Sequence, residues 1–443
     1  MNASSNVKII SVNTDCSAVC AAAARISTTV GTADEIFLKS KDNYKNSSLI
    51  SKVLDSGHQS IIEHVIFTIA FTNVSAFVEQ FFIEHRLASF TVKSRRYVDF
   101  SNIGYYIPSN LGGDSRMLYR QLMDTAIIVY EQLLKFGIPK EDARFALPYA
   151  FYSNFYCTVN ARELMHIINS IRAGRGQNIP ELQDVVKQLV EQLEEQFPII
   201  LDNLSDHSYD YVTNNIVTKN DAILVDASEV GSVQLVSKPC NPAELLDTAL
   251  RISGSSMTFA ELVHSERPRA LEHLNYSFVV EDVTLAGITH FTRHRMQSLV
   301  VPFIETASCN GRFIVPDSIK QNVHALEQYI WLCKYAHDFA KTAVENDILK
   351  HHMHYFALSG NLLDIMLTMN ARELLLFMQL RTCSRAQWEI RKVAGDMLSL
   401  LRDEHSALFN LYGPSCYVQG HCPENKLTCG QRATIIKKFG TDN

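Results

Sequence analysis

The sequence predicts an α+β protein made of two tandem homologous repeats, each a β-sheet packed with long helices. Two observations predict this fold class. Strand-like and helix-like patterns mix within each half of the chain, and short segments recur in the same order. VKIIS at residues 7–11 resembles VQLVS at 233–237, and NAREL at 160–164 recurs at 370–374. The chain is therefore expected to contain one folding unit twice.

Each repeat has the same expected order of elements after a short β-like opening and a helix. A β-branched and aromatic run at residues 65–74, and its counterpart at 275–283, predict strands. Ser75 and Thr284 come next and suit helix N-cap positions, and apolar residues with helical spacing follow them. A later long helix is expected from about Val159, with a counterpart at the matching place of the second repeat.

The spacing of the matching segments locates an insertion and the domain boundaries. The offset is 226 residues at VKIIS and 209 at the Glu-His pairs of residues 63–64 and 272–273. The difference of 17 residues lies in the first repeat, around residues 39–48. Polar residues typical of a connection accumulate between 204 and 231. We expect repeats at residues 1–215 and 216–412, followed by a cysteine-rich tail at 413–443.

Composition excludes several classes of protein. Of the 443 residues, 41 are Lys or Arg and 47 are Asp or Glu, a formal net charge of −6. This balance argues against a broad surface that coats nucleic acid. No run of about 18 apolar residues would span a membrane, and no signal peptide opens the chain. We expect a cytoplasmic protein with reduced thiols and neither a nucleic-acid nor a membrane partner.

Polar side chains cluster after the first expected short helix. His85, Ser89, Ser94 and Arg96 lie close together in sequence. Guanidinium groups offer planar charged forks that suit phosphate, and serine hydroxyls can complete a phosphate cradle. A solvated helix end with favourable cations is the alternative. The matching stretch of the second repeat is apolar, with Glu305 at the Arg96 position, so the repeats cannot offer equivalent anion sites.

Together these motifs resemble those of the flavin-dependent thymidylate synthases, here as a tandem duplication. That family's signature is Arg-His-Arg, about seven residues, then Ser-x-Arg. The chain has Glu-His-Arg at residues 84–86 and, seven residues later, Ser-Arg-Arg at 94–96. The Gly-His and Glu-His pairs of residues 57–64 resemble an upstream element of the family. The segment from NAREL to AQWEI, at residues 370–390, resembles its second half.

The resemblance implies an enzyme that uses FAD, NADPH and methylenetetrahydrofolate to methylate dUMP at carbon 5. Contacts to the dUMP-like nucleotide are implied for Gln80, Arg86, Ser94, Arg96, Arg144 and Arg381, of which Ser94, Arg96 and Arg381 would serve catalysis. Flavin contacts are implied for His64, His85, Arg86, Ser89, Asn160, Arg162, His273, Arg293, His294, Arg295, Ser298, Asn370 and Arg372. Arginine near the pyrimidine would stabilise negative charge that develops on its ring. No glycine-rich dinucleotide motif is present, so a Rossmann nicotinamide site is not expected.

The two repeats depart from the family pattern in different places. The first has Glu84 where the signature begins with Arg, and Thr91 where the family usually has Asn. The second lacks the Ser-x-Arg end of the signature and has His354 where the first has Arg144.

Helix geometry adds a further difference. Asn370 and Arg381 are 11 residues apart, which places them within about 20° of one helix face. Asn160 and Arg172 are 12 apart, so Arg172 is turned about 120° away unless a π-bulge absorbs one residue. We infer that only the second repeat keeps this arginine.

These complementary losses favour a site composed from both repeats, with Ser94 and Arg96 working beside Arg381. A homodimer of tandem chains would then form a pseudo-tetramer, because the family's members are typically homotetramers with sites where subunits meet. Two alternatives remain open. One is flavin-dependent transfer of a one-carbon unit to another pyrimidine, and the other is a non-catalytic protein that binds FAD or a nucleotide.

The tail offers a candidate metal site. Cys416, His421, Cys422 and Cys429 could supply four zinc ligands, although the usual Cys-x2-Cys pair is missing. The alternative is a turn-rich tail with packed or redox-sensitive thiols. The histidines of residues 351–354 are expected to be ordinary surface residues of a helix.

Overall fold

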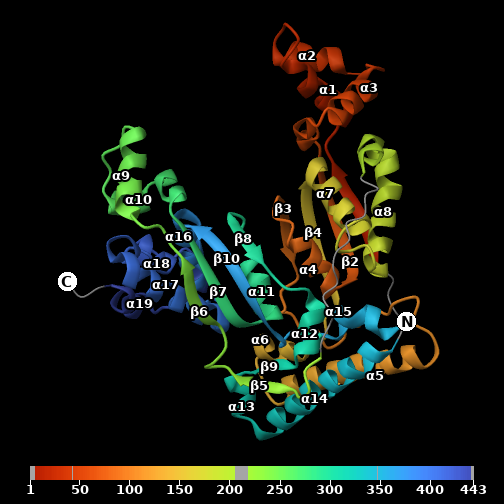
Figure 1. Ribbon diagram of the computed structural model, residues 1–443, viewed down its shortest axis with the longest axis vertical. Coiled ribbons are helices and arrows are strands. Elements are labelled where there is room, and N and C mark those ends of the chain that lie inside the picture. The colour runs from red at the N-terminus through yellow and green to blue at the C-terminus, as the bar shows by residue number, and fades with distance from the viewer. Residues whose placement is uncertain (1–4, 42, 205–217, 347, 441–443) are drawn as a thin grey trace. The chain divides into compact units, whose positions relative to one another are not determined.

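The computed structural model describes residues 5–41, 43–204, 218–346 and 348–440. By contacts it divides into two compact units. The first unit consists of Met1–Lys219 and Trp331–Leu358, and the second of Asn220–Ile330 and Ser359–Asn443. Both units combine helices with β-sheet (Figure 1), which agrees with the mixed class that the sequence predicts. No described helix has the length and apolar character needed to cross a membrane.

The first unit is built on a sheet in the order β1-β2-β4-β3, with antiparallel neighbours throughout. Its strands are β1 (Asn6–Val12), β2 (Ile66–Ser75), β3 (Ala88–Val92) and β4 (Tyr152–Asn160). Its helices are α1 (Cys16–Ile26), α2 (Ala33–Ser40), α3 (Asn46–Asp55), η1 (Gln59–His64), α4 (Ala76–Ile83), α5 (Gly113–Lys135), α6 (Lys140–Ala143), η2 (Arg144–Ala146), α7 (Ala161–Arg172), α8 (Pro180–Gln196), η3 (Pro198–Asn203), η5 (Leu349–His352) and α15 (Met353–Phe356).

The second unit repeats this sheet in the order β6-β7-β10-β8 and adds the parallel pair β5-β9. Its strands are β5 (Ile223–Asp226), β6 (Ser232–Ser237), β7 (Asn275–Thr284), β8 (Gln297–Val300), β9 (Arg312–Val315) and β10 (Leu362–Asn370). Its helices are α9 (Pro242–Ile252), α10 (Phe259–His264), η4 (Arg269–His273), α11 (Leu285–Phe291), α12 (Ile304–Asn310), α13 (Asp317–Lys320), α16 (Ala371–Arg381), α17 (Trp388–Phe409), α18 (Ser415–Val418), η6 (Asn425–Leu427) and α19 (Arg432–Phe439).

The two sheets match in detail as well as in order. Strands β2 and β7 show the same succession of buried and exposed residues along their whole length. Both bend at one matching residue with a left-handed backbone, Asn73 (φ 52°) and Asp282 (φ 55°). Asn and Asp tolerate this conformation better than other residues with a side chain. The short sequence matches between the two repeats therefore correspond to one strand geometry that occurs twice.

The predicted helix starts are correct where a capping side chain marks them. Ser75 caps α4 by accepting a hydrogen bond from the Val78 amide at 3.2 Å, and Thr284 caps α11 through the Gly287 amide at 2.8 Å. The later helix was expected from about Val159, but α7 begins at Ala161 because β4 continues to the residue before it.

The extra residues of the first repeat form helical structure. Helices α2 and α3 lie between α1 and the Glu-His pair of the first unit, whereas the second unit has only α10 in the described residues at the same place. Figure 1 shows α1, α2 and α3 grouped beyond one end of the sheet. The polar stretch at residues 39–48 contains the end of α2 and the start of α3.

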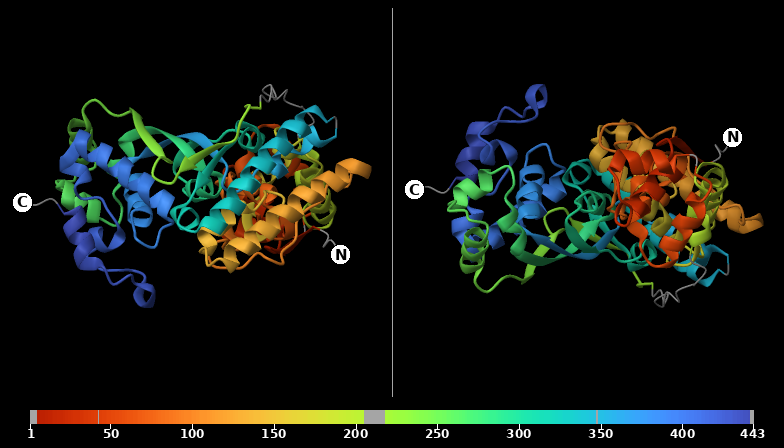
Figure 2. Two further views of the ribbon diagram at one scale, coloured as in Figure 1. Left: turned by 90° about the horizontal axis from the view of Figure 1, so that it is seen from below. Right: turned by 90° about the horizontal axis from the view of Figure 1, so that it is seen from above.

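The compact units differ from the sequence repeats, because part of the second repeat packs into the first unit. The Tyr149 amide donates to the Ala357 carbonyl at 2.8 Å, and Pro148 and Leu358 form an isolated antiparallel bridge. From Trp331 on, helix α14 (Val323–Glu345) runs beside α5 (Figures 1 and 2). The predicted boundaries describe a duplication of sequence and remain a prediction, and residues 205–217 of the connection lie outside the described residues.

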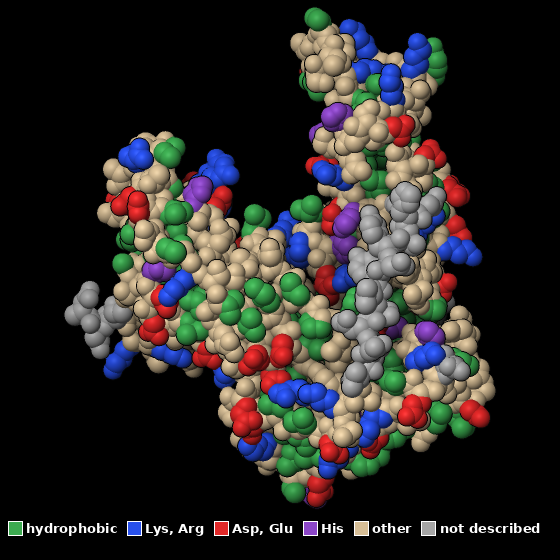
Figure 3. All heavy atoms as spheres, in the orientation of Figure 1, with side chains coloured by type: hydrophobic (Ala, Val, Ile, Leu, Met, Phe, Trp, Pro, Cys, Tyr) green, Lys and Arg blue, Asp and Glu red, His purple; other side chains and the backbone are tan. Residues whose placement is uncertain are grey.

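Charged side chains of both signs are interspersed on the surface. On the face drawn in Figure 3, Lys and Arg alternate with Asp and Glu over the elements of both units. This distribution suits a chain with a net charge of −6.

Candidate functional site

The residues with implied flavin contacts gather at one end of each sheet. In the first unit, His64 directly precedes β2, and the strand register places Ile66 opposite Asn160 and Ser89 opposite Thr158. The loop after α4 brings Arg86 to the same end of the sheet, just before β3. The second unit places the matching residues in the same way: His273, Arg293, Arg295, Ser298 and Asn370.

The two asparagines of this group are helix N-caps. The Asn160 side-chain oxygen accepts the Glu163 amide at 2.9 Å, and the Asn370 oxygen accepts the Glu373 amide at 2.9 Å. Each cap satisfies one of the amides that a helix start leaves without a partner. These side-chain oxygens therefore have a structural task, and the amide nitrogens are the groups of Asn160 and Asn370 that remain to donate to a ligand.

The two NAREL arginines are held by the Glu-His pairs. Arg162 pairs with Glu63 and Arg372 pairs with Glu272, each at 2.5 Å. All four side chains are partly or largely exposed, so these pairs add little to stability. They fix the two guanidinium groups beside the residues that precede β2 and β7.

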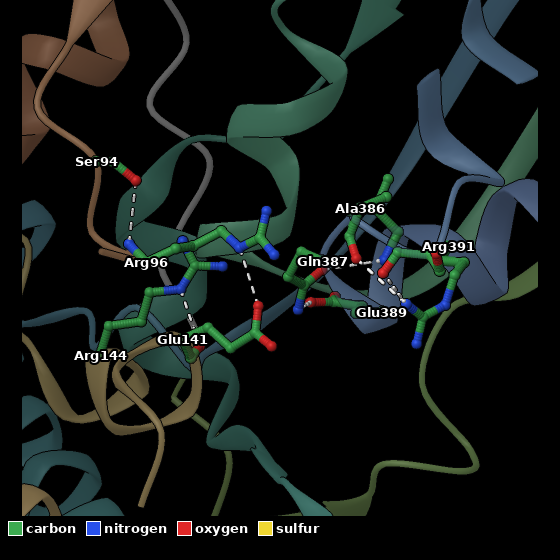
Figure 4. A network of polar contacts seen from close by, with 10 residues as sticks. Ser94, Arg96, Glu141, Arg144, Ala386, Gln387, Glu389 and Arg391 are labelled. Atoms are coloured by element: carbon green, nitrogen blue, oxygen red, sulfur yellow. Dashed lines mark hydrogen bonds and ion pairs between the residues drawn. The ribbon is translucent and has the colours of Figure 1, made fainter. Parts of the chain in front are cut away.

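The signature loop of the first unit brings two arginines together. Arg96 Nε donates to Glu141 Oε2 at 2.9 Å, and Arg144 Nε donates to the Glu141 carbonyl at 3.0 Å. The Ser94 hydroxyl accepts the Arg96 amide at 3.3 Å, and Figure 4 shows these four side chains. Guanidinium groups held close together in this way suit an anion such as phosphate. The sequence grouped Ser94, Arg96 and Arg144 correctly but did not indicate Glu141.

The arginine between Ser94 and Arg96 points into the protein interior. Arg95 forms an ion pair with Glu79 at 2.6 Å, and its guanidinium lies over the Phe151 ring at 4.9 Å from the centroid. The Ser153 hydroxyl donates to the other Glu79 oxygen. Both charged residues are buried, so the pair anchors the signature loop to the core of the first unit.

A loop arginine of the first unit takes the place that was expected to lack one. Arg172 is exposed, as the helix geometry predicts. Arg175, which follows α7, donates to the Phe81 carbonyl at 3.4 Å, and Arg381 donates to the matching His290 carbonyl at 3.3 Å. The first repeat thus has a guanidinium at this carbonyl, from Arg175 and not from Arg172, and the loss of the arginine's function in this repeat stays a prediction. A loop places Arg175, and loop geometry does not follow from helical periodicity.

The replacement for the signature's first arginine explains how Arg175 is held. Glu84 pairs with the Arg175 guanidinium, which also lies over the Phe81 ring at 4.4 Å from the centroid. Glu84 accepts from Gln80 as well, at 2.9 Å. The positive charge of Arg175 is thus matched by a carboxylate from the signature itself.

In the second unit, Arg381 lies against a histidine. Arg381 Nε donates to His294 Nε2 at 3.1 Å, and His294 Nδ1 lies 2.8 Å from Glu373 Oε1. Both His294 and Glu373 are buried. The sequence indicated Arg381 and His294 but not Glu373, whose only signal was its place in the NAREL motif.

Buried polar atoms of the first unit can accommodate a polar ligand group. Among the described residues, His85 Nε2 and Gln80 Oε1 are buried without a hydrogen-bond partner. Burial, followed by the nearby Arg175 and His166, lowers the pKa of His85 to about 3, so its ring is neutral at physiological pH. A neutral imidazole and an amide oxygen suit the uncharged polar edge of a ring system such as flavin or a pyrimidine.

Each unit also buries a glutamate that the sequence analysis did not select. Glu181 accepts the Ser75 amide at 2.8 Å, and Glu389 accepts the Thr284 amide at 2.7 Å. In the first unit, the Tyr355 hydroxyl donates to Glu181 at 2.8 Å. Burial raises the pKa of Glu181 to about 7. The recurrence of Glu near the start of α8 and α17 was the available signal.

The histidines of residues 351–354 are not all surface residues, contrary to expectation. His352 and His354 are buried, and the His354 ring packs on Phe77 with centroids 4.2 Å apart. Burial and the two neighbouring histidines lower the pKa of His352 to about 4. The prediction failed because residues 331–358 pack into the interior of the first unit, a contact that local sequence does not reveal.

The expected metal ligands of the tail are not grouped into a metal site in the described residues. Within the described ranges, no three His, Cys, Asp or Glu side chains are grouped so that they could hold a metal ion. His421 is exposed and contacts the Gln419 carbonyl. Burial and then the negative charge of three other thiols raise the pKa of Cys416. Those neighbours are Cys383, Cys422 and Cys429.

Fold and site together define an α+β protein that contains one unit of sheet and helices twice. In each unit, arginine and histidine side chains lie near the short helix that follows β2 or β7, which is α4 or α11. The sequence model of the thymidylate synthase complementing protein family matches residues 8–199 and again residues 234–405. The chain belongs to this family, in a tandem form. The two matches cover most of the chain and correspond to the two sheets.

Curated relatives are named flavin-dependent thymidylate synthases. The one from Geobacter sulfurreducens is 34% identical over 27% of this chain and 53% of its own length, and the one from Saccharolobus solfataricus is 33% identical over 35% and 60%. The chain thus spans just over half the length of these relatives. Among solved structures, thymidylate synthase X from Helicobacter pylori with FAD and dUMP is 20% identical, with a TM-score of 0.38 over 46% of this chain and all of that one.

Proposed function

We propose that this chain is a flavin-dependent thymidylate synthase, which converts dUMP to dTMP with methylenetetrahydrofolate and NADPH through FAD. The observation that carries the proposal is the double family match together with the arginine pair at Glu141. A pair of guanidinium groups suits a nucleotide phosphate. Relatives with more than 30% identity that bear the name of this activity support the same conclusion.

In this proposal the side chains of the first unit hold the phosphate. Arg96 and Arg144 would each turn from Glu141 toward the phosphate oxygens, and the Ser94 hydroxyl would add a third donor. The Arg95–Glu79 pair would keep the loop in place during this exchange, because both side chains are buried in the first unit. Orientation of the nucleotide is then the task of this loop.

Flavin would supply the hydride chemistry that this fold's side chains do not provide. The buried polar atoms of His85 and Gln80 fit such a group, as do the arginines at the ends of the sheets. The protein's part is to bind, to orient and to stabilise negative charge on the pyrimidine ring, for which Arg381 is the proposed residue.

We propose in addition that the nucleotide site draws Ser94 and Arg96 from one repeat and Arg381 from the other, within one chain or across a homodimer. Arg175 does not replace Arg381 in this scheme, because the Glu84 carboxylate already matches its charge. The tail remains a candidate zinc site, with Cys416, His421, Cys422 and Cys429 as the proposed ligands.

The direct test measures tritium release from dUMP labelled at carbon 5, with FAD, NADPH and methylenetetrahydrofolate present. Arg96→Ala and Arg381→Ala should each lower kcat/KM by about 30- to 150-fold, because one lost charged hydrogen bond costs about 2–3 kcal/mol. The exposed Arg172→Ala is the matched control and should retain activity. Absence of tritium release by the wild-type protein would refute the function, and turnover of UMP but not dUMP would favour the alternative pyrimidine substrate.

A further inference from the structure

A row of three polar side chains crosses the interior of the second unit. Glu373 Oε1 lies 2.8 Å from His294 Nδ1, and His294 Nε2 lies 3.1 Å from Arg381 Nε. Arg381 also donates to the His290 carbonyl at 3.3 Å. His294 is 3% exposed and Glu373 6%, so water does not compete strongly for these bonds.

The chemistry of the row fixes where its protons lie. A guanidinium can only donate, so the His294 Nε2 that faces Arg381 must present its lone pair. In the neutral ring, Nδ1 then carries the hydrogen and donates it to the Glu373 carboxylate. Glu373 therefore selects the tautomer that can accept from Arg381. The opposite tautomer would point an N–H at the guanidinium and lose both bonds.

The helix α16 brings the members of the row together. Glu373, Phe377 and Arg381 recur every four residues and therefore lie along one face of the helix. The His294 ring contacts the middle residue edge-on, with centroids 4.9 Å from those of Phe377. The Asn370 cap at the start of α16 fixes the amide of Glu373 at 2.9 Å. One helix face thus determines the position of these three residues around the His294 ring.

The first unit has the same residue types at two of the three positions but not the row. His85 Nδ1 lies 3.8 Å from Glu163 Oε1, which is too long for a hydrogen bond. Ile171 stands where Arg381 stands in the second unit, and the guanidinium comes instead from Arg175. The charge of Arg175 is matched by Glu84, outside such a row.

We propose that Glu373 is a positioning residue that, through the tautomer of His294, orients Arg381 toward the dUMP pyrimidine. This inference rests on the proposed function, because it assigns the ligand of Arg381. With Nε on His294 and one terminal nitrogen on the His290 carbonyl, the guanidinium plane is fixed at two points. A planar donor held in this way suits the carbonyl edge of a pyrimidine ring better than a mobile one.

The test is a double-mutant cycle on dUMP affinity, measured by calorimetry with the FAD-loaded protein. Glu373→Leu should weaken dUMP binding by about 10-fold or more, the value of one charged hydrogen bond. Glu373→Gln keeps an oxygen acceptor for Nδ1–H and should stay within about 3-fold of wild type. In an Arg381→Ala background, Glu373→Leu should have no further effect, because the residue acts only through Arg381. Glu163→Leu is the matched control in the first unit and should not alter affinity.

Three outcomes decide between the two proposals. If the wild type binds dUMP and Glu373→Leu binds equally well, or if Glu373→Leu still weakens binding without Arg381, the positioning role is overturned. If the wild type binds no dUMP, the proposed function fails. The row is then judged by the ¹⁵N shifts of His294 in histidine-labelled protein. A hydrogen on Nδ1 of His294 in the wild type, and its loss in Glu373→Leu, support the proposed tautomer of the row. A hydrogen on Nε2 in the wild type refutes it. The wild-type shifts alone test this tautomer if Glu373→Leu does not fold.

Discussion

Replacing Glu79 alone, in the buried Glu79–Arg95 pair, should destabilise the first unit far more than replacing Glu79, Arg95 and Ser153 together. Glu79 and Ser153 are each 1% exposed, and Arg95 is 6% exposed. The three positions that match them in the second unit are apolar and equally buried: Ile288, Ile304 and Leu363. The same fold therefore accepts either a charged or an apolar filling at this place.

The single and the triple variant should differ strongly in their free energy of unfolding. Glu79→Ile leaves the Arg95 guanidinium buried without its carboxylate, which should lower the free energy of unfolding by about 3–5 kcal/mol. The triple variant Glu79→Ile, Arg95→Ile, Ser153→Leu installs the filling of the second unit and leaves no buried charge. It should lie within about 1 kcal/mol of wild type or be more stable, because the desolvation cost of both ions disappears.

Hydrogen–deuterium exchange of peptides from β4 measures this in the first unit alone. Glu79→Ile should speed exchange there by roughly 150-fold or more, as follows from a loss of about 3 kcal/mol. The triple variant should exchange at nearly the wild-type rate, and peptides from β10 serve as the internal control. If the single and the triple variant exchanged at similar rates, whether both slow or both fast, Glu79 and Arg95 would not behave as a desolvated ion pair.

Three further predictions concern charges elsewhere in the chain. Burial raises the pKa of Glu181 to about 7 from an ordinary 4.5, so its contribution to stability is complete below about pH 4.5 and is lost as pH rises to 7. The urea midpoint should fall over this window by the equivalent of at most about 3 kcal/mol, and Glu181→Gln should flatten the fall; an unchanged slope would contradict this. Arg175→Ala should cost about 1 kcal/mol of stability without weakening dUMP binding, since Glu84 already matches the arginine's charge; loss of binding in calorimetry would show that this arginine is part of the site. If the tail binds zinc, elemental analysis of the purified protein should find it in the wild type but not in Cys416→Ser, and a metal-free wild type would end that proposal.

Local signals in the sequence were sufficient for the start of each repeat's helices. Ser75 and Thr284 were predictable as caps because a hydroxyl before an apolar helical run has few other roles. The grouping of Ser94 with Arg96 and Arg144 was predictable from the family motif. These features depend on short stretches of chain or on whole motifs, which the sequence displays directly.

Features that depend on contacts between distant segments were not predictable. Glu141 and Glu79 are ordinary glutamates until the fold brings them to the signature loop. Arg175 lies in a loop, where periodicity gives no direction for a side chain. His354 was expected at the surface because nothing in its neighbourhood indicates that its segment packs on Phe77. In each case the missing information was a long-range partner.

The passage of residues 331–358 into the first unit imposes an order on biosynthesis. The partner that Glu181 requires, Tyr355, leaves the ribosome only after most of the second repeat has been translated. The interior of the first unit stays incomplete until residues 331–358 have been translated. The contacts that then complete it join segments far apart in sequence, and such contacts form slowly. A gene fragment that ends near residue 219 should therefore yield an aggregation-prone product, and truncation studies of this protein need to retain residue 358.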